Sequence, residues 1–537
     1  MIRLSQITMP VGHTMDALKQ KCFKLLNISP AEVKCFTIVK QSIDARKKPD
    51  IFYSYVIDIA CDKEERVLKR SRCKQAELVR AEGYHFPKAG TEPLKAPVVI
   101  IGMGPAGLFC GYMLARYGYR PIILERGQDV DTRAEKVKTF WETGILDPEC
   151  NVQFGEGGAG TFSDGKLNTL IKDKYGRNKE VLRILVENGA PEQILYDAKP
   201  HIGTDILSAV VKRMREQIIS WGGEVHFNSL VTDFEITNKH LSAVKLFDGT
   251  NIVCSNVVLA IGHSARDTFE ILYNLGVPMT AKAFSVGFRV EHPQSLINKS
   301  LYGVEKHPLL GAAPYKVTAK TSTGRGVFSF CMCPGGYVVN ASSEQGALAV
   351  NGMSYSDRGG DNANSAVIVT VTPEDFGGDH ALSGVEFQRK LEKKAYELGK
   401  GSIPVCWYGN FKQAVTGENT SECLDDYTPC IKGTYREADL TGLLTEDMNR
   451  AFIEGMEHFH RIIPGFAAAN VWMDGIESRT SSPVRIERDE RMQSEVRGLY
   501  PCGEGAGYAG GITSAAMDGI RVAEEIAGIY KPLDGKE

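Results

Sequence analysis

One glycine-rich turn constrains the fold of this chain more than any other feature of its sequence. The apolar run 97–101 is typical of a parallel strand buried on both faces. The motif G-x-G-x-x-G follows at 102–107 and opens the helical pattern 105–117. In such a motif the first glycine permits the tight turn, the second lets the backbone approach a pyrophosphate, and the third lets the helix pack on the strand. The pattern therefore predicts a βαβ unit that binds a dinucleotide.

An acidic residue stands where this unit needs one. Glu125 follows the second apolar strand, 120–124, and lies roughly 20 residues beyond the glycine motif. Its carboxylate can accept hydrogen bonds from an adenosine ribose and would repel a 2′-phosphate, which favours a cofactor with a free 2′-hydroxyl. The next residue, Arg126, is also predicted to contact the cofactor. Arg133 is a candidate contact to the adenosine or the pyrophosphate, and a solvated helix arginine is the alternative.

The far C-terminal region favours FAD over NAD as the cofactor. Residues 498–507 predict a strand that carries Glu504 between glycines, and residues 510–519 lead from further glycines into a helix. FAD suits this arrangement, because one site can hold its ADP half while a distant loop holds its ribityl chain. A helix N-terminus near 511–513 would also stabilise negative charge on the reduced flavin. The sequence therefore predicts FAD.

The length of 537 residues predicts two or three domains. We expect an α/β fold in which a Rossmann-like FAD-binding domain carries an inserted β-rich substrate or cap domain, preceded by a small ferredoxin-like α+β domain. The predicted boundaries are 1–93 for the N-terminal domain, 94–280 and 475–537 for the two parts of the FAD-binding domain, and 281–474 for the cap domain.

Within the N-terminal domain, hydrophobic patterns predict a small sheet with two helices. The predicted elements are strands near 2–8, 33–40 and 51–58 and helices over 15–26 and 63–72. Residues 45–50 predict a turn, and the prolines and glycine of 86–97 predict a linker to the next domain.

Composition argues against several classes of partner. The formal net charge of −3 does not favour general binding to nucleic acid or to an anionic membrane. The sequence shows neither a signal-peptide pattern nor a run of about 18 apolar residues, so we expect a cytoplasmic protein that does not enter a membrane. Its 13 cysteines form no CxxC pair, which indicates reduced thiols. His458 and His460 lack a metal-ligand pattern, so no metal is predicted.

Beyond these local patterns, the sequence resembles the glutathione-reductase-type FAD superfamily. The short apolar strand 256–262 ends in the A-x-G of Ala260 and Gly262, as in that superfamily. The resemblance implies that the acid of the last strand contacts the ribityl–pyrophosphate region of FAD. That acid is Glu504 here, whereas the superfamily usually has Asp. The resemblance also implies that Val231 presents a backbone group to adenine.

More narrowly, the chain resembles a bacterial family described as FAD-dependent dehydrogenases of unassigned substrate. The likeness rests on the segments 151–167, 330–336 and 475–485 and covers most of the chain. The first segment has five glycines between Gly155 and Gly165, so its backbone can press against a flat ring or a phosphate. By resemblance, such a loop lies beside the isoalloxazine. The family implies a flavin cofactor without naming a reaction.

Together these motifs predict the residues that bind FAD. They come from the phosphate turn, the acid and its neighbours, the glycine string, the adenine strand, the A-x-G strand and the C-terminal loop: Gly102, Gly104, Pro105, Ala106, Gly107, Glu125, Arg126, Arg133, Gly157, Gly158, Ala159, Gly160, Thr161, Lys166, Val231, Ala260, Gly262, Gly503, Glu504, Gly510, Gly511, Ile512 and Thr513. We expect these residues to converge on a single cofactor.

The candidate catalytic residues each have a structural alternative. Lys166 either places a positive charge near the flavin or anchors its loop at the surface. His263 is either a proton donor near the substrate or a structural histidine. Cys331 and Cys333 point the same way if their segment is a strand, so they either act as a redox pair or flavin-facing thiol, or pack as small core residues. A disulfide between alternate residues of an extended strand would be strained.

Three arginines lie where the domains should meet. Arg266 is expected near the cofactor cleft, and Arg479 and Arg485 belong to the segment that returns the chain to the FAD-binding domain. The last two either grip a substrate carboxylate or form ordinary interface ion pairs.

These features predict an FAD-dependent oxidoreductase, a dehydrogenase or reductase, that moves a hydride or two electrons between FAD and an unidentified small molecule. Only one G-x-G-x-x-G follows a strand, so NAD(P)H is expected to bind transiently if it binds at all. The alternatives are a flavin enzyme that modifies RNA or another macromolecule, a non-enzymatic redox sensor or electron carrier, and a polyprenyl reductase. The substrate, the acid–base residue and the oligomeric state do not follow from the sequence.

Overall fold

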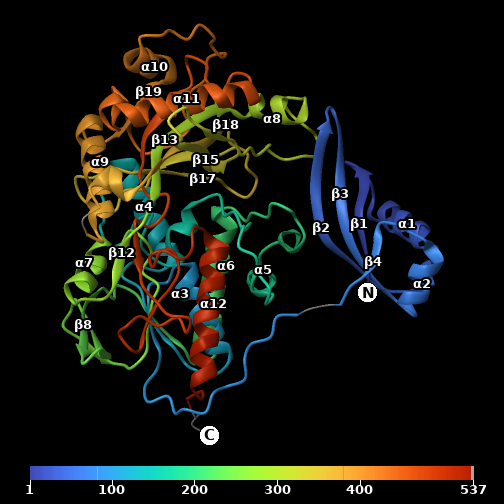
Figure 1. Cartoon of the computed structure of the whole chain (residues 1–537), viewed down its shortest axis with the longest axis horizontal. Coiled ribbons are helices and arrows are strands. Elements are labelled where there is room, and N and C mark those ends of the chain that lie inside the picture. The colour runs from blue at the N-terminus through green and yellow to red at the C-terminus, as the bar shows by residue number, and fades with distance from the viewer. Residues whose placement is uncertain (81–82, 379, 534–537) are drawn as a thin grey trace.

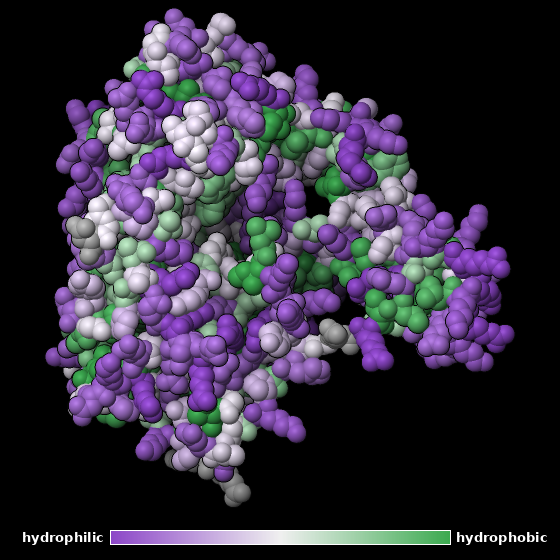
Figure 2. Space-filling view, in the orientation of Figure 1, coloured by the Kyte–Doolittle hydropathy of each residue, from purple (hydrophilic) through white to green (hydrophobic). Residues whose placement is uncertain are grey.

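The computed structural model describes residues 1–80, 83–378 and 380–533. Figure 1 shows a small N-terminal unit beside a larger body, with an extended segment running between them. Hydrophilic residues cover most of the face seen in Figure 2, as in other folded proteins with an apolar interior. The predicted domains include residues 81–82, 379 and 534–537, which lie outside the described residues.

The N-terminal unit is a four-stranded antiparallel sheet in the order β2-β3-β1-β4, with two helices packed on it. Its elements are β1 (Ile2–Pro10), α1 (Met15–Leu26), β2 (Val33–Lys47), β3 (Asp50–Cys61), α2 (Glu64–Ser71) and β4 (Ala76–Leu78). This βαββαβ order is that of a ferredoxin-like unit. Helix α1 begins after Thr14, whose side chain accepts a hydrogen bond from the N–H of Ala17.

The turn predicted at 45–50 is wrong in extent. Strand β2 continues to Lys47, which still pairs with Asp50 of β3. The basic residues of this region therefore lie at the end of a hairpin instead of in a six-residue loop, because cross-strand pairing outweighs the local preference of charged residues for a turn.

The larger body is built on a five-stranded parallel sheet in the order β24-β11-β5-β6-β7. Its strands are β5 (Val99–Ile101), β6 (Ile122–Leu124), β7 (Glu224–His226), β11 (Val257–Leu259) and β24 (Leu499–Pro501). The glycine motif therefore follows the central strand, and the C-terminal strand β24 lies only two strands away. This topology brings segments far apart in the sequence to one edge of one sheet.

The two faces of the parallel sheet are covered differently. Four helices share one hydrophobic cluster on the first face: α3 (Pro105–Arg116), α5 (Arg177–Glu187), α6 (Thr204–Ser220) and α12 (Ile512–Ile529). The second face is covered by a small antiparallel sheet and one helix: β8 (Val231–Thr237), β9 (His240–Leu246), β10 (Asn251–Val253) and α7 (Arg266–Asn274). Gly519 lets α12 approach α3, because a Cβ there would lie 2.1 Å from the carbonyl oxygen of Ala106.

The predicted linker is held against the body. The N–H of Gly90 donates to the carbonyl of Ala527 at 2.8 Å, and the ring of Phe86 stacks on Tyr117 with centroids 4.0 Å apart. In Figure 1 this segment passes beneath the C-terminal end of α12. These contacts fix a stretch that its composition alone would leave extended and free.

A seven-stranded sheet in the order β14-β15-β18-β13-β22-β19-β21 forms the rest of the body. Its strands are β13 (Phe284–Pro293), β14 (Thr318–Lys320), β15 (Gly326–Cys333), β18 (Asn362–Val371), β19 (Ile403–Trp407), β21 (Tyr435–Glu437) and β22 (Trp472–Glu477). Smaller pairings join β16 (Tyr337–Asn340) with β17 (Val350–Met353) and β20 (Ile431–Lys432), and β12 (Met279–Ala281) with β23 (Val484–Ile486).

The β-rich description of 281–474 is therefore incomplete. Four helices accompany the sheet: α8 (Gln294–Tyr302), α9 (Ser383–Gly399), α10 (Tyr408–Thr416) and α11 (Glu446–Ile462). Helices α10 and α11 pack on the sheet through an aromatic cluster of Phe288, Phe411 and Phe452. None of the helices in the described ranges has the length and apolar character needed to cross a membrane.

Candidate functional site

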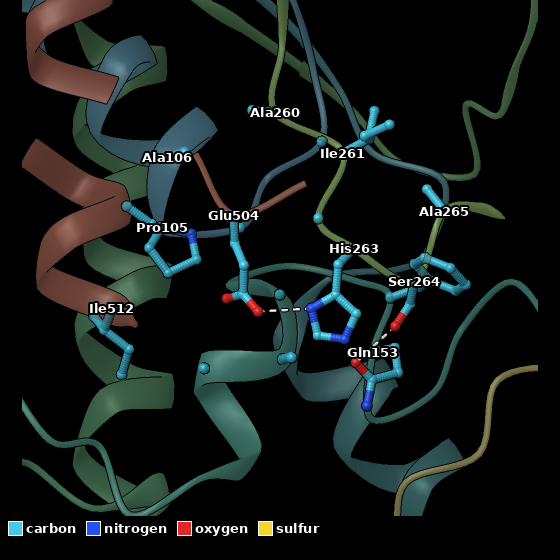
Figure 3. Close-up of a pocket in the computed structure, with 18 of the residues that line it drawn as sticks. Pro105, Ala106, Gln153, Ala260, Ile261, His263, Ser264, Ala265, Glu504 and Ile512 are labelled. Atoms are coloured by element: carbon cyan, nitrogen blue, oxygen red, sulfur yellow. Dashed lines mark hydrogen bonds and ion pairs between the residues drawn. The ribbon is translucent and has the colours of Figure 1, made fainter. Parts of the chain in front are cut away.

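A pocket lies at the carboxyl ends of the parallel strands, where ligands of such sheets bind. Its lining includes the ends of β5 and β6 and the residues that follow β11 on one side. On the other side it includes residues of β15 and β22 from the seven-stranded sheet and of β17 from the small sheet of β16, β17 and β20. Figure 3 shows the part of this pocket in which the N-terminal ends of α3 and α12 face the segment that follows β11. The pocket thus lies between the two sheets of the body.

Most of the residues predicted to bind a cofactor line this pocket. They are Gly102, Gly104, Pro105, Ala106, Glu125, Arg126, Gly158, Ala159, Gly160, Lys166, Val231, Ala260, Gly262, Glu504, Gly510, Gly511 and Ile512. The candidates His263 and Cys331 line it as well. The first motif and the C-terminal loop therefore line one cavity.

Several predicted residues lie behind the lining and support it. A Cβ at Gly107 would lie 1.9 Å from the carbonyl oxygen of Gly102, and one at Gly503 would lie 2.6 Å from the Cβ of Ala106, so both glycines serve close packing. Thr513 donates its hydroxyl to the carbonyl of Leu167 at 2.7 Å. Gly157, Thr161 and Cys333 are likewise outside the pocket lining.

Two glycines of the lining have no structural need to be glycine. Gly104 has φ −70° and ψ −178°, a conformation that any residue adopts. A Cβ there would meet its nearest described neighbour, the Cα of Gly158, at 3.8 Å, which is an ordinary contact. A Cβ at Gly510 would meet nothing within 4 Å in the described part of the chain. Glycine at such positions keeps room for a ligand that presses against the backbone.

Two helix N-termini point at this open space. Gly104 is the N-cap of α3 and Gly511 is the N-cap of α12, so among the residues that the structure describes neither helix has an N-cap side chain on its first N–H groups. These N–H groups and the positive ends of both helix dipoles can stabilise negative charge at two points of one ligand. Pro105, Ala106 and Ile512 lie together at these ends in Figure 3.

Glu125 is held in place by the glycine-rich backbone around it. Its carboxylate accepts hydrogen bonds from the N–H groups of Met103 at 2.8 Å, Gly127 at 2.9 Å and Gly155 at 2.9 Å. A carboxylate has about four acceptor sites, so one site is left for a ribose hydroxyl in the pocket. Glu125 thus shapes the turn as well as lining the cavity.

The two arginines near this acid have different roles. Arg126 lines the pocket, but its guanidinium is bound to Glu149 and Asp267 and lies over the ring of Phe154 at 4.2 Å. The prediction that Arg133 contacts the cofactor is wrong, and so is its solvated alternative. The side chain is fully buried and donates to backbone carbonyls of the glycine-string segment: Asn151, Val152, Gly155 and Glu156.

His263 and Glu504 form a polar pair in the pocket. The Nδ1 of His263 lies 2.6 Å from the Oε1 of Glu504, as the dashed line in Figure 3 shows. The Nε2 of the same ring is buried and has no hydrogen-bond partner among the described residues. A buried polar atom without a partner costs about 1–3 kcal/mol. The ring is therefore placed to bond a ligand, while Glu504 fixes its orientation.

The opposite wall carries an acid that sequence reasoning missed. Glu477, at the end of β22, lines the pocket and accepts a hydrogen bond at 2.9 Å from the Nε of Arg289 on β13. Both side chains are buried. Burial raises the pKa of Glu477 to about 7, although the charge of Arg289 opposes that rise. A pocket carboxyl that titrates near neutral pH is suited to hold or release a proton.

The sequence suggested that Cys331 and Cys333 lie on a regular strand, but the structure shows an irregular one. Between Phe330 and Cys333 the pairing of β15 with β18 shifts register, and Cys331 has φ +42°. Such a bulge re-aims side chains. Cys331 is therefore half-buried and faces the pocket, whereas Cys333 is buried behind it.

The other lysine and arginine candidates mostly interact with neighbouring groups of the protein. Lys166 lines the pocket with its Nζ 3.7 Å from the Oδ2 of Asp164. Arg479 also lines it, but its guanidinium is bound by Glu392 and by the Ser343 hydroxyl. Arg485 is exposed, with its guanidinium 5.1 Å from the ring centroid of Tyr508.

The raised pKa of Glu477 predicts that the stability of the protein depends on pH. Glutamate in an unfolded chain titrates near pH 4.3, so between about pH 4.5 and pH 7 the folded state keeps a proton that the unfolded state releases. The contribution of Glu477 to stability therefore declines as pH rises through this window. We expect the free energy of unfolding of the wild type, relative to Glu477→Gln, to fall by about 2–3 kcal/mol between pH 5 and pH 8.

Urea unfolding at several pH values measures this difference. The control is Glu490→Gln, the same change at an exposed site. A difference between wild type and Glu477→Gln that stays constant with pH would show that Glu477 is ionised throughout the range.

Comparisons with known sequences agree with the character of this site. The family described as "FAD-dependent protein, C-terminal domain-like" matches residues 283–480, and a domain of unknown function matches residues 1–60. An uncharacterized protein of Clostridium beijerinckii is 48% identical over 530 residues, which is 98% of each chain. A flavin-dependent monooxygenase of an unknown prokaryotic organism is 29% identical over 126 residues, 21% of this chain and 32% of the relative. FAD, the predicted cofactor, is confirmed by the family match.

Solved structures of two oxidoreductases align with this chain only loosely. The L-proline dehydrogenase of P. horikoshii aligns with 82% of this chain and 96% of its own at 15% identity, with a TM-score of 0.32. The glycine oxidase of Bacillus cereus aligns with the same shares at 12% identity, with a TM-score of 0.33. We draw nothing about substrate from likenesses at this level.

Proposed function

Because this chain belongs to one family with its Clostridium beijerinckii relative and carries an FAD-dependent domain, we propose that it is an oxidoreductase that transfers two electrons or a hydride between bound FAD and a small organic molecule. The observation that carries this proposal is the open space beside Gly104 and Gly510, which lies at the N-termini of α3 and α12. It supports a Rossmann-like FAD-binding fold of the glutathione-reductase type, in which the seven-stranded sheet serves as the cap that shapes the substrate side.

The pocket offers a holding group for each part of the cofactor. The N-terminus of α3 at Gly104 would hold the pyrophosphate, and the free acceptor site of Glu125 would hold the adenosine ribose. The N-terminus of α12 at Gly511 would stabilise negative charge on the flavin. When bound, FAD supplies the capacity to accept and release two electrons.

The chain's own side chains would orient the substrate and handle its protons. Glu477 and Cys331 line the pocket from the cap side, and the His263–Glu504 pair lines it from the side of the parallel sheet. Glu477 can hold a proton at neutral pH, and the free Nε2 of His263 can donate or accept a hydrogen bond. The apolar lining contributed by Ile101 and Phe330 would limit water at the reacting atoms.

The test is an anaerobic titration of the purified, FAD-loaded protein with a panel of metabolites and, separately, with NADH and NADPH. We expect at least one small organic compound to bleach the flavin absorption, or to restore it after chemical reduction. Bleaching by a nicotinamide alone would instead assign the reductive half-reaction to NAD(P)H that binds transiently. A flavin that responds to no small molecule, while its redox state changes affinity for a protein partner, would favour the electron carrier or redox sensor.

The structure lends no support to the macromolecule-modifying alternative. That alternative requires a basic face joining residues 46–48 to the pocket. Arg46 is instead bound by the carboxylate of Asp44, and Lys48 donates to the backbone carbonyl of Ser300. We therefore propose a small-molecule substrate.

A further inference from the structure

Two thiols on the cap side of the pocket form a cluster with a buried cation. Cys331 is half-buried and lines the pocket, and Cys333 is fully buried behind it. The Cys333 thiol donates to the backbone carbonyl of Cys331 at 3.2 Å. Arg289 donates to the same carbonyl at 3.1 Å and lies 3.9 Å from the sulfur of Cys333.

The backbone around these thiols is shaped to expose one of them. Three residue steps from Phe330 to Cys333 on β15 face two steps from Ala366 to Asn364 on β18, so the strand carries one extra residue. Cys331 takes a positive φ, which is uncommon for a residue with a side chain and is found more often at functional sites. Packing alone would not require this conformation.

Space is also reserved for the buried cation. A Cβ at Gly352 would lie 2.2 Å from an Nη of Arg289, so this glycine makes room for the guanidinium. Arg289 is fully buried, and it is oriented by Glu477 and by the amide oxygen of Asn364. Its charge reaches both thiols through low-dielectric surroundings.

These contacts distinguish Cys331 from the packing cysteines of this chain. The neighbouring Cys333 thiol, together with the charge of Arg289, lowers the pKa of the Cys331 thiol, although burial opposes this. Burial raises the pKa of Cys110 and of Cys502, which are core residues. Burial likewise raises the pKa of Cys333, so the pKa values of the two thiols shift in opposite directions.

We propose that Cys331 and Cys333 are a redox-active pair that reduces a small organic disulfide bound in the pocket, with Cys331 as the attacking thiol and Cys333 as the resolving thiol. This rests on the proposed function and names the substrate class of the same site. A second thiol in contact with an attacking thiolate is what disulfide exchange requires. The bulge replaces the extended strand on which a disulfide between alternate residues would be strained.

The exchange balances as a single two-electron oxidation of the thiol pair. The Cys331 thiolate attacks one sulfur of the disulfide R–S–S–R, which forms a mixed disulfide on Cys331 and expels RS⁻. Cys333 then loses its proton and attacks the sulfur of Cys331, which closes a Cys331–Cys333 disulfide and expels the second RS⁻. One RS⁻ takes up the proton that Cys333 releases, and the other takes up a proton from water. The substrate gains two electrons and the protein pair loses two.

The experiment uses the full-length, FAD-loaded protein and glutathione disulfide as the probe. The background variant Cys35→Ser/Cys423→Ser removes the two exposed cysteines. After anaerobic incubation at pH 7, free thiols are trapped with N-ethylmaleimide and the peptides are mapped by mass spectrometry. We expect a Cys331–Cys333 disulfide in the background variant. Adding Cys333→Ser should leave glutathione on Cys331, and adding Cys331→Ser should lower modification of Cys333 at least tenfold.

The matched control is Cys430→Ser, which replaces another partly buried cysteine and should change none of these products. The proposal is overturned if the Cys333→Ser protein carries no more glutathione on Cys331 than on Cys406. The visible absorption of the same samples reports flavin separately. A yellow protein without exchange rejects the thiol proposal alone, and a colourless protein that exchanges rejects only the flavin function.

A second readout tests the thiolate itself. The charged groups that face Cys331 are Arg289 from β13, Lys166 and Asp164 from the glycine-string loop, and Glu477 from β22. In the wild-type chain we expect alkylation of Cys331 by iodoacetamide to slow less than about threefold between pH 8.5 and pH 6.5, while free cysteine with the reference pKa of about 8.5 slows about 50-fold. Slowing at Cys331 equal to that of free cysteine would contradict a thiolate at Cys331.

Discussion

Replacing Gly104 with valine should leave the chain folded but raise the dissociation constant for FAD at least about 100-fold, or roughly 3 kcal/mol. The backbone at Gly104 accepts any residue, and the protein around it leaves ordinary contact distance for a Cβ. The added side chain would therefore meet the ligand instead of the protein, at the place where a pyrophosphate must approach the N-terminus of α3. Titration of flavin-free protein with FAD measures the change, and circular dichroism reports the fold.

The matched control is Gly311→Val, at an exposed glycine whose Cβ would meet nothing within 4 Å in the described part of the chain. It should bind FAD as the wild type does. If Gly104→Val also bound FAD normally, the pyrophosphate could not lie against this turn. A variant that failed to fold would contradict the claim that only the ligand needs a glycine here.

Glu392→Ala should lower the free energy of unfolding by about 3–5 kcal/mol. Glu392 on α9 is fully buried. Its carboxylate bridges Arg266 on α7 and Arg479 on the segment that follows β22 and leaves the cap. It also accepts the hydroxyl of Ser478 at 2.6 Å. The alanine variant would leave the buried guanidinium groups of Arg266 and Arg479 without this shared partner. The loss would fall where α7, which covers the parallel sheet, meets α9 of the cap.

Urea unfolding at pH 7 measures this loss. The control is Glu386→Ala, on the same helix but with an exposed side chain that pairs with His380 at 3.4 Å, and it should change stability by less than about 0.5 kcal/mol. If Glu392→Ala cost no more than the control, the network would not hold the two halves of the body together.

The parts of this molecule that follow from local sequence were predictable. Helix α1 has the predicted bounds, because its cap at Thr14 and its apolar spacing lie within one short segment. The strand–glycine–helix unit and Glu125 were predictable for the same reason. The glycines and acid of the C-terminal loop predicted a second contact to the same cofactor, and the adjacency of β24, β11 and β5 brings this loop to the pocket of the glycine motif.

What the sequence did not reveal depends on contacts between distant segments. Glu477 and Arg289 meet because β13 pairs with β22, and no spacing within either strand indicates the partner. The direction of the Arg133 side chain, inward to four backbone carbonyls, is set by the fold of the glycine-string segment beneath it. The bulge at Cys331 arises from its pairing with β18 and contradicts the simple alternation of a strand.

The central claim is that the turn at 102–107 and the loop at 504–512 hold opposite parts of one FAD. The most direct measurement is a titration of flavin-free, full-length protein with FAD, followed by the absorption and fluorescence of the bound flavin. We predict saturation at one FAD per chain, with binding weakened both by Gly104→Val and by Gly510→Val. Absence of binding, or a Gly510→Val variant that binds FAD as tightly as the wild type, would contradict the claim.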